Sequence, residues 1–159
     1  MKVSDVMTRS VATCSPRESL NDAARIMWER DCGIVPIVAD GDRKVVGVIT
    51  DRDICIAAYT QGLPLVQIRI GEVMSPHITS CRADQEVAAA EDSMQRAQVH
   101  RLPVIDDGGK LVGIVALADL ARASARGARA NKPGVSSVEV GETVAAICRP
   151  RQLEAAIGI

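Results

Sequence analysis

The 159-residue chain repeats itself with a period of about 67 residues. Four pairs of segments carry the repeat: Asp5-Val6-Met7-Thr8 with Glu72-Val73-Met74-Ser75, Val35-Pro36-Ile37-Val38 with Leu102-Pro103-Val104-Ile105, Lys44–Ile49 with Lys110–Val115, and Asp53 with Asp119. A repeat of this length holds a complete structural unit. The sequence therefore predicts two similar units that pack together.

Hydrophobic periodicity changes in the same order within each copy. Leu20, Ala23, Ala24 and Met27 follow helical spacing, and the apolar runs 34–39 and 45–50 are joined by the polar turn 40–43. Short strands are expected before the first helix, at 11–14 and 78–81, and second helices from about Asp51 and Leu117. Each unit is thus predicted to be an α/β unit of the order β-α-β-β-α.

These patterns divide the chain into four parts. We expect the first repeat at 1–58, a linker at 59–70, the second repeat at 71–123, and a C-terminal basic segment and tail at 124–159. The tail resembles the opening of a further unit but stops too soon to complete one, so it is expected to dock as an arm.

Aromatic residues are nearly absent, at 1% of a chain that is 47% apolar, and Trp28 and Tyr59 are the only rings. Modules that bind single-stranded nucleic acid stack bases on aromatic side chains and need a basic groove. With 19 basic against 20 acidic residues, the net charge of -1 offers no general attraction for nucleic acid or anionic membranes. Any anion site must therefore be local.

Neither membrane nor catalytic signals are found in the sequence. The longest uncharged run, 54–68, is shorter than the ~20 residues of a membrane helix, and Asp5 does not suit a secretory signal, so a cytoplasmic location is expected. The five cysteines include no close pair, and nucleophile-elbow, zinc-protease and P-loop motifs are absent. We expect no enzyme, no catalytic residue, no metal site and no required cofactor.

Thr50 and Asp53 are spaced as a pair at the start of a predicted helix. One interpretation is a helix cap, in which both side chains bind exposed backbone N–H groups. The other is a nucleotide site, in which Asp53 accepts hydrogen bonds from ribose hydroxyls and Thr50 faces a phosphate at the helix N-terminus. In the second copy Ala116 replaces the hydroxyl residue while Asp119 remains.

The runs 99–106, 113–115 and 47–53 resemble the CBS domain over roughly residues 1–123. The resemblance implies a tandem pair, or Bateman module, packed about a pseudo-twofold axis with two clefts. Such pairs commonly bind AMP, ADP, ATP, NAD or S-adenosylmethionine, form homodimers and regulate another protein. Since no catalytic domain or channel is attached, the chain is expected to be a stand-alone bacterial-type sensor with an unknown effector.

The same resemblance assigns residues to the clefts. One unit's Thr-x-x-Asp pair is completed by the other unit's stretch before Leu-Pro-Val, and the expected ligand-binding residues are Thr50, Asp53, Val99, His100, Arg101, Ile78 and Thr79. Arg101 suits a phosphate because its planar, permanently charged group makes two hydrogen bonds. A weaker second cleft is expected to contain Asp119, Gly33 and Ile34.

A ligand-independent dimeric scaffold or interaction protein is the alternative function. A less favoured form of it associates with nucleic acid through Arg122, Arg126 and Arg129, which recur at helical spacing. Basic residues at a helix end more often complement its negative pole.

Overall fold

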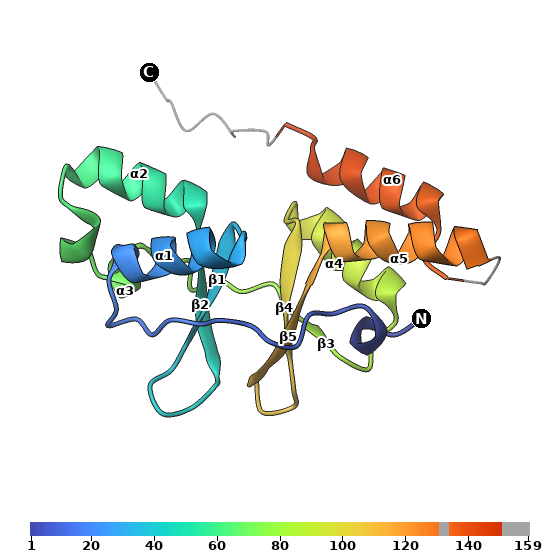
Figure 1. Ribbon diagram of the computed structural model, residues 1–159, viewed down its shortest axis with the longest axis horizontal. Helices are drawn as coiled ribbons and strands as arrows, with labels where there is room; N and C mark the ends of the chain where they lie inside the picture. Colours follow the sequence, from blue (N-terminus) through green and yellow to red (C-terminus); the bar gives the residue numbers. More distant parts are fainter. Residues whose placement is uncertain (131–133, 151–159) are drawn as a thin grey trace, which may run out of the picture.

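The computed structural model describes residues 1–130 and 134–150, with the backbone alone at 128–130. The described elements in chain order are η1 (Val3–Asp5), α1 (Leu20–Arg30), β1 (Ile34–Val38), β2 (Val45–Thr50), α2 (Asp51–Gln61), η2 (Leu65–Gln67), α3 (Ile70–Val73), β3 (Cys81–Arg82), α4 (Val87–Ala97), β4 (Arg101–Ile105), β5 (Leu111–Ala116), α5 (Leu117–Ala130) and α6 (Ser137–Ile147). The predicted α/β architecture of two similar halves is confirmed (Figure 1).

The halves exchange their leading segments reciprocally. Thr8 pairs with Ile114 of β5, and Ser75 pairs with Val48 of β2, so each copy's first residues add to the other copy's hairpin. At the hairpin tips Val45 N–H donates to the Gly109 carbonyl at 3.1 Å, and Leu111 N–H donates to Arg43 at 2.8 Å. These matched exchanges give the molecule its pseudo-twofold arrangement.

Glycines make these crossings fit. A Cβ atom at Gly47 would lie 2.7 Å from Met74 Sδ, and one at Gly113 would lie 2.8 Å from Met7 Sδ. The same Cβ atoms would lie 3.0 Å from the Ser75 carbonyl oxygen and 2.9 Å from the Thr8 carbonyl oxygen, which cannot rotate away, so glycine lets the crossing backbone approach each strand closely.

Each half has its own aliphatic core. The leading segment of each copy packs into the core of the other half. The first core gathers buried residues between Cys14 and Ile70, whereas the second combines Val3 of the N-terminus with residues from Cys81 to Ile147. Neither core contains an aromatic ring, because Trp28 and Tyr59 are both exposed.

Both predicted leading strands are shorter than expected. The strand predicted at 11–14 is reduced to a single parallel pairing of Cys14 with Ile37, and its counterpart predicted at 78–81 is the two-residue strand β3, which overlaps the prediction only at Cys81. The residues before Cys14 carry the chain across from the second half to the first (Figure 1), which leaves them poorly placed to extend a ladder.

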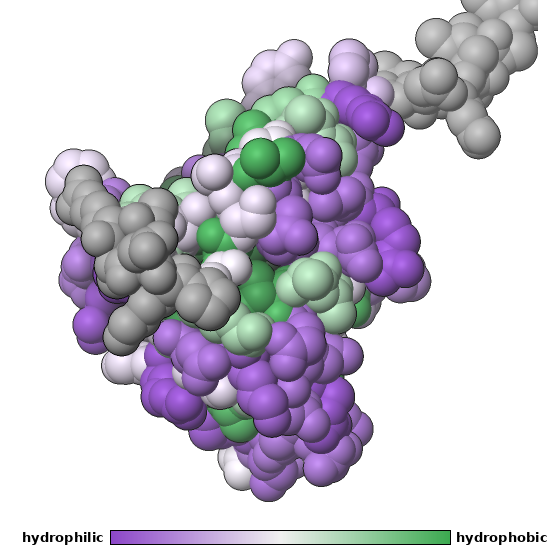
Figure 2. All heavy atoms as spheres, turned by 90° about the vertical axis from the view of Figure 1, so that its right-hand side faces the viewer, coloured by the Kyte–Doolittle hydropathy of each residue, from purple (hydrophilic) through white to green (hydrophobic). Residues whose placement is uncertain are grey.

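The C-terminal segment forms a helix that docks on the second half. Ser136 caps α6 by accepting from Val138 N–H at 3.2 Å, and α6 packs on α4 and α5. Figure 2 shows this end of the molecule, where polar residues surround a central apolar patch. Among the described helices none is long and apolar enough to cross a bilayer.

Candidate ligand-binding site

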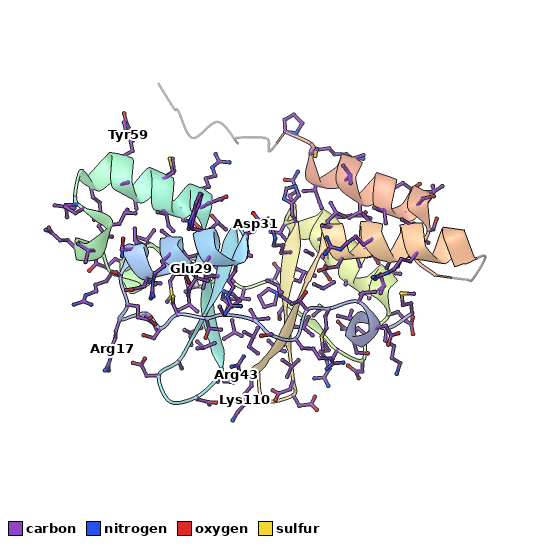
Figure 3. The ribbon with its side chains drawn as sticks, viewed as in Figure 1. Arg17, Glu29, Asp31, Arg43, Tyr59 and Lys110 are labelled. Atoms are coloured by element: carbon purple, nitrogen blue, oxygen red, sulfur yellow. The ribbon has the colours of Figure 1, made fainter. Side chains whose placement is uncertain are left out.

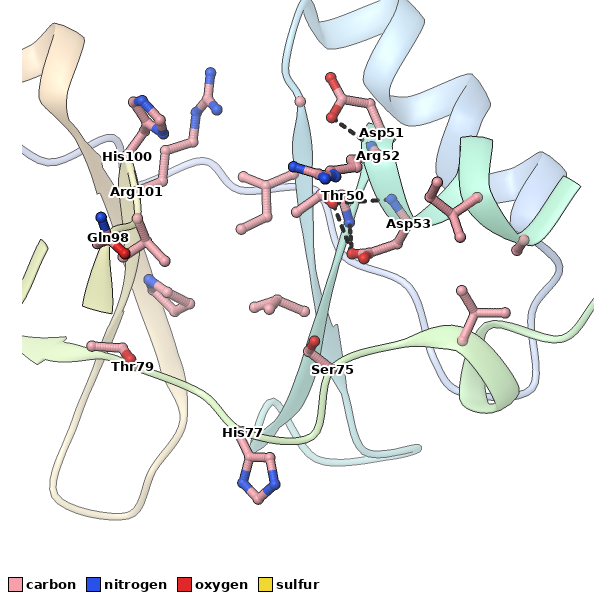
Figure 4. A pocket seen from close by; sticks show the side chains of 18 of the residues that line it. Thr50, Asp51, Arg52, Asp53, Ser75, His77, Thr79, Gln98, His100 and Arg101 are labelled. Atoms are coloured by element: carbon pink, nitrogen blue, oxygen red, sulfur yellow. Dashed lines mark hydrogen bonds between the residues drawn. The ribbon is translucent and has the colours of Figure 1, made fainter. Parts of the chain in front are cut away.

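A cavity of about 900 Å³ lies between the two halves (Figure 4). Its size falls in the range of small-molecule sites. The lining residues are Gly33, Ile34, Val48, Thr50, Asp51, Arg52, Asp53, Ile56, Ala57, Thr60, Gln61, Glu72, Val73, Ser75, His77, Thr79, Gln98, Val99, His100, Arg101 and Pro103. Six of the seven residues expected in the main cleft are among them, drawn from segments far apart in the sequence.

Thr50 and Asp53 form a reciprocal cap at the start of α2. The Thr50 hydroxyl and backbone N–H both donate to Asp53 Oδ2, at 2.7 and 2.9 Å, and Asp53 N–H donates back to Thr50 Oγ1 at 3.2 Å. The cap interpretation of this pair is therefore confirmed. Because the Thr50 proton is committed to Asp53, Thr50 orients the carboxylate, and Asp53 Oδ1 has no hydrogen-bond partner among the described residues.

The opposite wall comes from the second half. Val99 and His100 precede β4 and Arg101 begins it, and His100 and Arg101 lie across the cavity from the start of α2 (Figure 4). A Cβ atom at Gly33 would lie 3.6 Å from Arg101 Nη1, so the guanidinium reaches the other half. The crossed arrangement expected from the family resemblance is thus present in the geometry.

Positive charge in the cavity is not neutralised by fixed ion pairs. Within residues 1–130 and 134–150, neither Arg52 nor Arg101 makes a side-chain ion pair or hydrogen bond. The N-terminus of α2 adds a partial positive charge at the same place. Together they favour an anionic group beside Arg101.

Alternate residues of the extended segment between α3 and β3 line the cavity floor. Ser75, His77 and Thr79 are lining residues, although the His77 ring points away from Thr50 and Arg101 (Figure 4), whereas Ile78 does not line the cavity. Successive side chains of an extended chain point to opposite sides. Thr79 thus lies at the cavity as expected, whereas Ile78, its neighbour in the expected set, is not a lining residue.

The residues expected in a weaker second cleft are not brought together. Ile34 pairs with Thr50 in the antiparallel ladder, and Asp51 N–H donates to the Gly33 carbonyl at 3.3 Å, so both residues join the main cavity. Asp119 does not line that cavity. Its Oδ2 accepts from Ala116 N–H at 2.8 Å, and its other oxygen is bound by the Arg122 guanidinium.

Several lining residues lie outside the predicted set, among them His77, Arg52 and Gln98. His77 follows from Thr79 by strand alternation, which would have found it, and Arg52 lies beside the predicted cap. No sequence pattern pointed to Gln98. It ends α4 with a left-handed φ of 50°, a conformation that a sequence would normally indicate by glycine or asparagine.

The tail arginines do not form a free basic stripe. Arg122 is bound to Asp119, Arg126 is exposed, and the side chain of Arg129 lies outside the described residues. Among the described residues no group of three or more His, Cys, Asp or Glu side chains is placed to hold a metal ion.

The sequence profile of the CBS domain matches residues 3–59 and 70–126. The CBS domain-containing protein YhcV of Bacillus subtilis is 40% identical over 75% of this chain and 82% of its own length. The solved CBS domain pair of MJ0100, in complex with 5'-methylthioadenosine and S-adenosyl-L-methionine, has a TM-score of 0.69 at 28% identity and covers 77% of this chain and 98% of that one. CBSX2 in complex with AMP also has a TM-score of 0.69, at 26% identity, over 79% and 96% of the two chains.

Proposed function

Because this chain belongs to the CBS-domain family and carries two copies of that domain, we propose that it is a non-enzymatic sensor of an adenine nucleotide or a related adenosyl ligand. The ligand occupies the cavity between the two halves. The observation that carries the proposal is that Asp53 Oδ1 and the Arg101 guanidinium, neither of which has a partner among the described residues, line one cavity.

The two walls supply the two recognition chemistries that such a ligand needs. Asp53 accepts hydrogen bonds from the vicinal hydroxyls of the ribose, and Thr50 holds its carboxylate in place. Arg101, His100 and the N-terminus of α2 bind the phosphate or another polar end. Ile34, Val48 and Val99 supply aliphatic walls, and Thr79 a polar group, around the adenine. Adenine does not require an aromatic partner for this.

The ligands seen in the solved relatives support this class. MJ0100 is in complex with 5'-methylthioadenosine and S-adenosyl-L-methionine, and CBSX2 is in complex with AMP. AMP, ADP, ATP, NAD and S-adenosylmethionine all share the adenosine that Asp53 would recognise, and they differ in the group presented to Arg101. Since these are cytoplasmic metabolites, the proposal places the sensor in the cytoplasm.

We also propose that the sensor is a homodimer that reports to a separate effector protein. Trp28 and Tyr59 are 88% and 85% exposed on neighbouring helices, and Tyr59 points outward from α2 (Figure 3). By the repeat they correspond to Gln95 and Ala125, which face α6 in the second half. No charged residue lies between Asp53 and Arg69, so the α2 side of this face can meet its own copy without like-charge repulsion.

A panel of AMP, ADP, ATP, NAD and S-adenosylmethionine, with CMP as the pyrimidine control, tests the proposal by calorimetry and thermal unfolding. A ligand at a hundred times its dissociation constant stabilises the folded state by about 2.7 kcal/mol. Stabilisation by at least one adenosine compound, and none by CMP, is expected. No response to any member, or conversion of a nucleotide to product, would overturn the proposal.

A further inference from the structure

Helix α6 lies outside the residues that match the CBS domain, yet it is fixed firmly to the second half. It buries Val140, Thr143 and Ile147 against α4 and α5. The fully buried Thr143 hydroxyl accepts a hydrogen bond from Gln95 Nε2 at 2.9 Å. A buried hydroxyl with its partner in place indicates a specific docked position rather than a loose cover.

Gln98 connects this helix to the cavity. Its Nε2 donates to the Arg149 carbonyl at 2.9 Å and approaches the Ala146 carbonyl at 3.5 Å, at the C-terminal end of α6. The same residue lines the ligand cavity beside His100 and Arg101 (Figure 4). One side chain therefore contacts both the proposed binding site and the end of a helix that does not line that site.

The repeat shows that this connection belongs to one half only. The residue corresponding to Gln98 is Asp31, which ends α1 with the matching left-handed φ of 49°. Asp31 is too short to span a similar distance, and among the described residues no helix covers α1 and α2 as α6 covers α4 and α5. The backbone conformation is shared, while the long amide side chain and its helix are special to the second half.

We propose that α6 is a reporter helix whose docking and the occupancy of the cavity favour each other through Gln98. This inference rests on the proposed function. With α6 docked, its terminal carbonyls hold the Gln98 amide and leave the cavity open beside His100 and Arg101. With α6 released, the amide loses the Ala146 and Arg149 carbonyls as acceptors, and the long side chain can turn toward the cavity that it lines.

The coupling is reciprocal by thermodynamic necessity. A ligand that needs the open cavity must strengthen α6 docking by the same factor by which docked α6 strengthens its binding. For a single connecting residue we expect a factor of about five, at the lower end of measured couplings between sites. Binding is thereby reported as a change in how firmly α6 covers α4 and α5.

Hydrogen exchange on the full chain tests the proposal with AMP as the probe and S-adenosylmethionine in a second arm. Amides 50–53 and 99–101 report binding, and amides 137–147 report the docking of α6 in the same sample. Slower exchange in both groups is expected on addition of a bound probe. Protection of the cavity amides without any change in α6 overturns the coupling and leaves the proposed function intact.

Thr143→Val tests the coupling from a position on α6 that lies away from the cavity. It removes the acceptor of Gln95 at a position that does not line the cavity, so α6 amides should exchange faster and the probe should bind about fivefold more weakly. Ser93→Ala is the matched control, since it removes one hydroxyl hydrogen bond from α4, to Ala89, that does not involve α6.

Three outcomes contradict the proposal. Unchanged affinity in Thr143→Val, despite faster exchange of α6, shows that docking does not reach the cavity. Equal weakening in Ser93→Ala shows that the effect is general loss of stability. If neither probe slows exchange in either group of amides, the protein does not bind these nucleotides. The proposed function and the coupling are then both contradicted.

Discussion

Arg122 binds the carboxylate of Asp119 one turn along the same helix, whereas no cation occupies the corresponding position at Asp53. Both aspartates accept a backbone N–H at the start of their helix, at 2.9 Å for Asp53 and 2.8 Å for Asp119. Asp119 is thus neutralised within its own helix. The two halves share one capping geometry but differ in which carboxylate is available to a ligand.

Replacing Asp53 by Ala is expected to remove most of the stabilisation by an adenosine ligand, and Asp119→Ala much less. A ligand at a hundred times its dissociation constant raises the unfolding free energy by about 2.7 kcal/mol in the wild type. Each variant is compared with and without ligand, which cancels the loss of the helix cap itself. Equal losses in the two variants would contradict a single principal site.

Arg101→Gln is expected to weaken binding of AMP by about 10- to 100-fold, the cost of a lost hydrogen bond to a charged group. Adenosine, which has no phosphate, should bind both forms alike. The ratio of the two affinities, measured by calorimetry, isolates the phosphate contact. Arg126→Gln, an exposed arginine outside the cavity, serves as the control. A parallel loss of adenosine binding would assign Arg101 to the fold instead.

The stability of the protein is expected to fall as pH rises from about 5 to about 7, and then to level off. Burial, followed by the charges of Glu139 on α6 and Asp92 on α4, raises the pKa of Glu91 from 4.5 to about 7. The folded state therefore binds a proton that the unfolded state has released, so stability is lost as pH increases. The change is on the order of 2 kcal/mol.

Urea unfolding across this pH range measures the effect, with Glu91→Gln as the test variant. The neutral amide should flatten the profile, because Glu91 Oε1 is buried without a partner among the described residues. Glu29→Gln, at an exposed position on α1, should leave the slope unchanged. An unaltered profile in Glu91→Gln would show that another group titrates.

Gly113→Ala is expected to destabilise the protein by about 1–3 kcal/mol, because the new Cβ overpacks the crossing segment. It would lie 2.8 Å from Met7 Sδ and 2.9 Å from the Thr8 carbonyl oxygen. Gly141→Ala, inside α6 with no atom within 4 Å of the new Cβ, should instead stabilise by about 0.5–1 kcal/mol. Denaturant midpoints of both variants test the exchange of segments. Tolerance of Gly113→Ala would argue against it.

Trp28 offers a direct measurement of self-association because it is the only tryptophan. Its emission should shift to shorter wavelength as concentration rises and the exposed indole becomes buried between copies. Tyr59→Glu should abolish the shift and give a monomer in analytical ultracentrifugation. Val138→Glu, on the outer side of α6, is the control. Emission independent of concentration, with a monomeric mass, would exclude this face as the dimer contact.

Local patterns in the sequence determined the building blocks. The repeat and the change from helical to strand periodicity predicted the order of elements, and the Thr50-x-x-Asp53 spacing predicted the cap at α2. These features depend on neighbouring residues, so a single chain contains them. The crossed site came from family resemblance and not from spacing, since Asp53 and Arg101 are remote in sequence.

Tertiary structure alone decided the contacts that join remote segments. The one-residue register of the segment around Ile78, the entry of Gly33 and Ile34 into the main cavity, and the reach of Gln98 to α6 all depend on how separately predictable elements pack. Side-chain direction alternates at every residue in extended chain, so a small error of register reverses a prediction. The sequence by itself determined two similar units and the cap at α2, and the packing between the units decided which polar groups meet in one cavity.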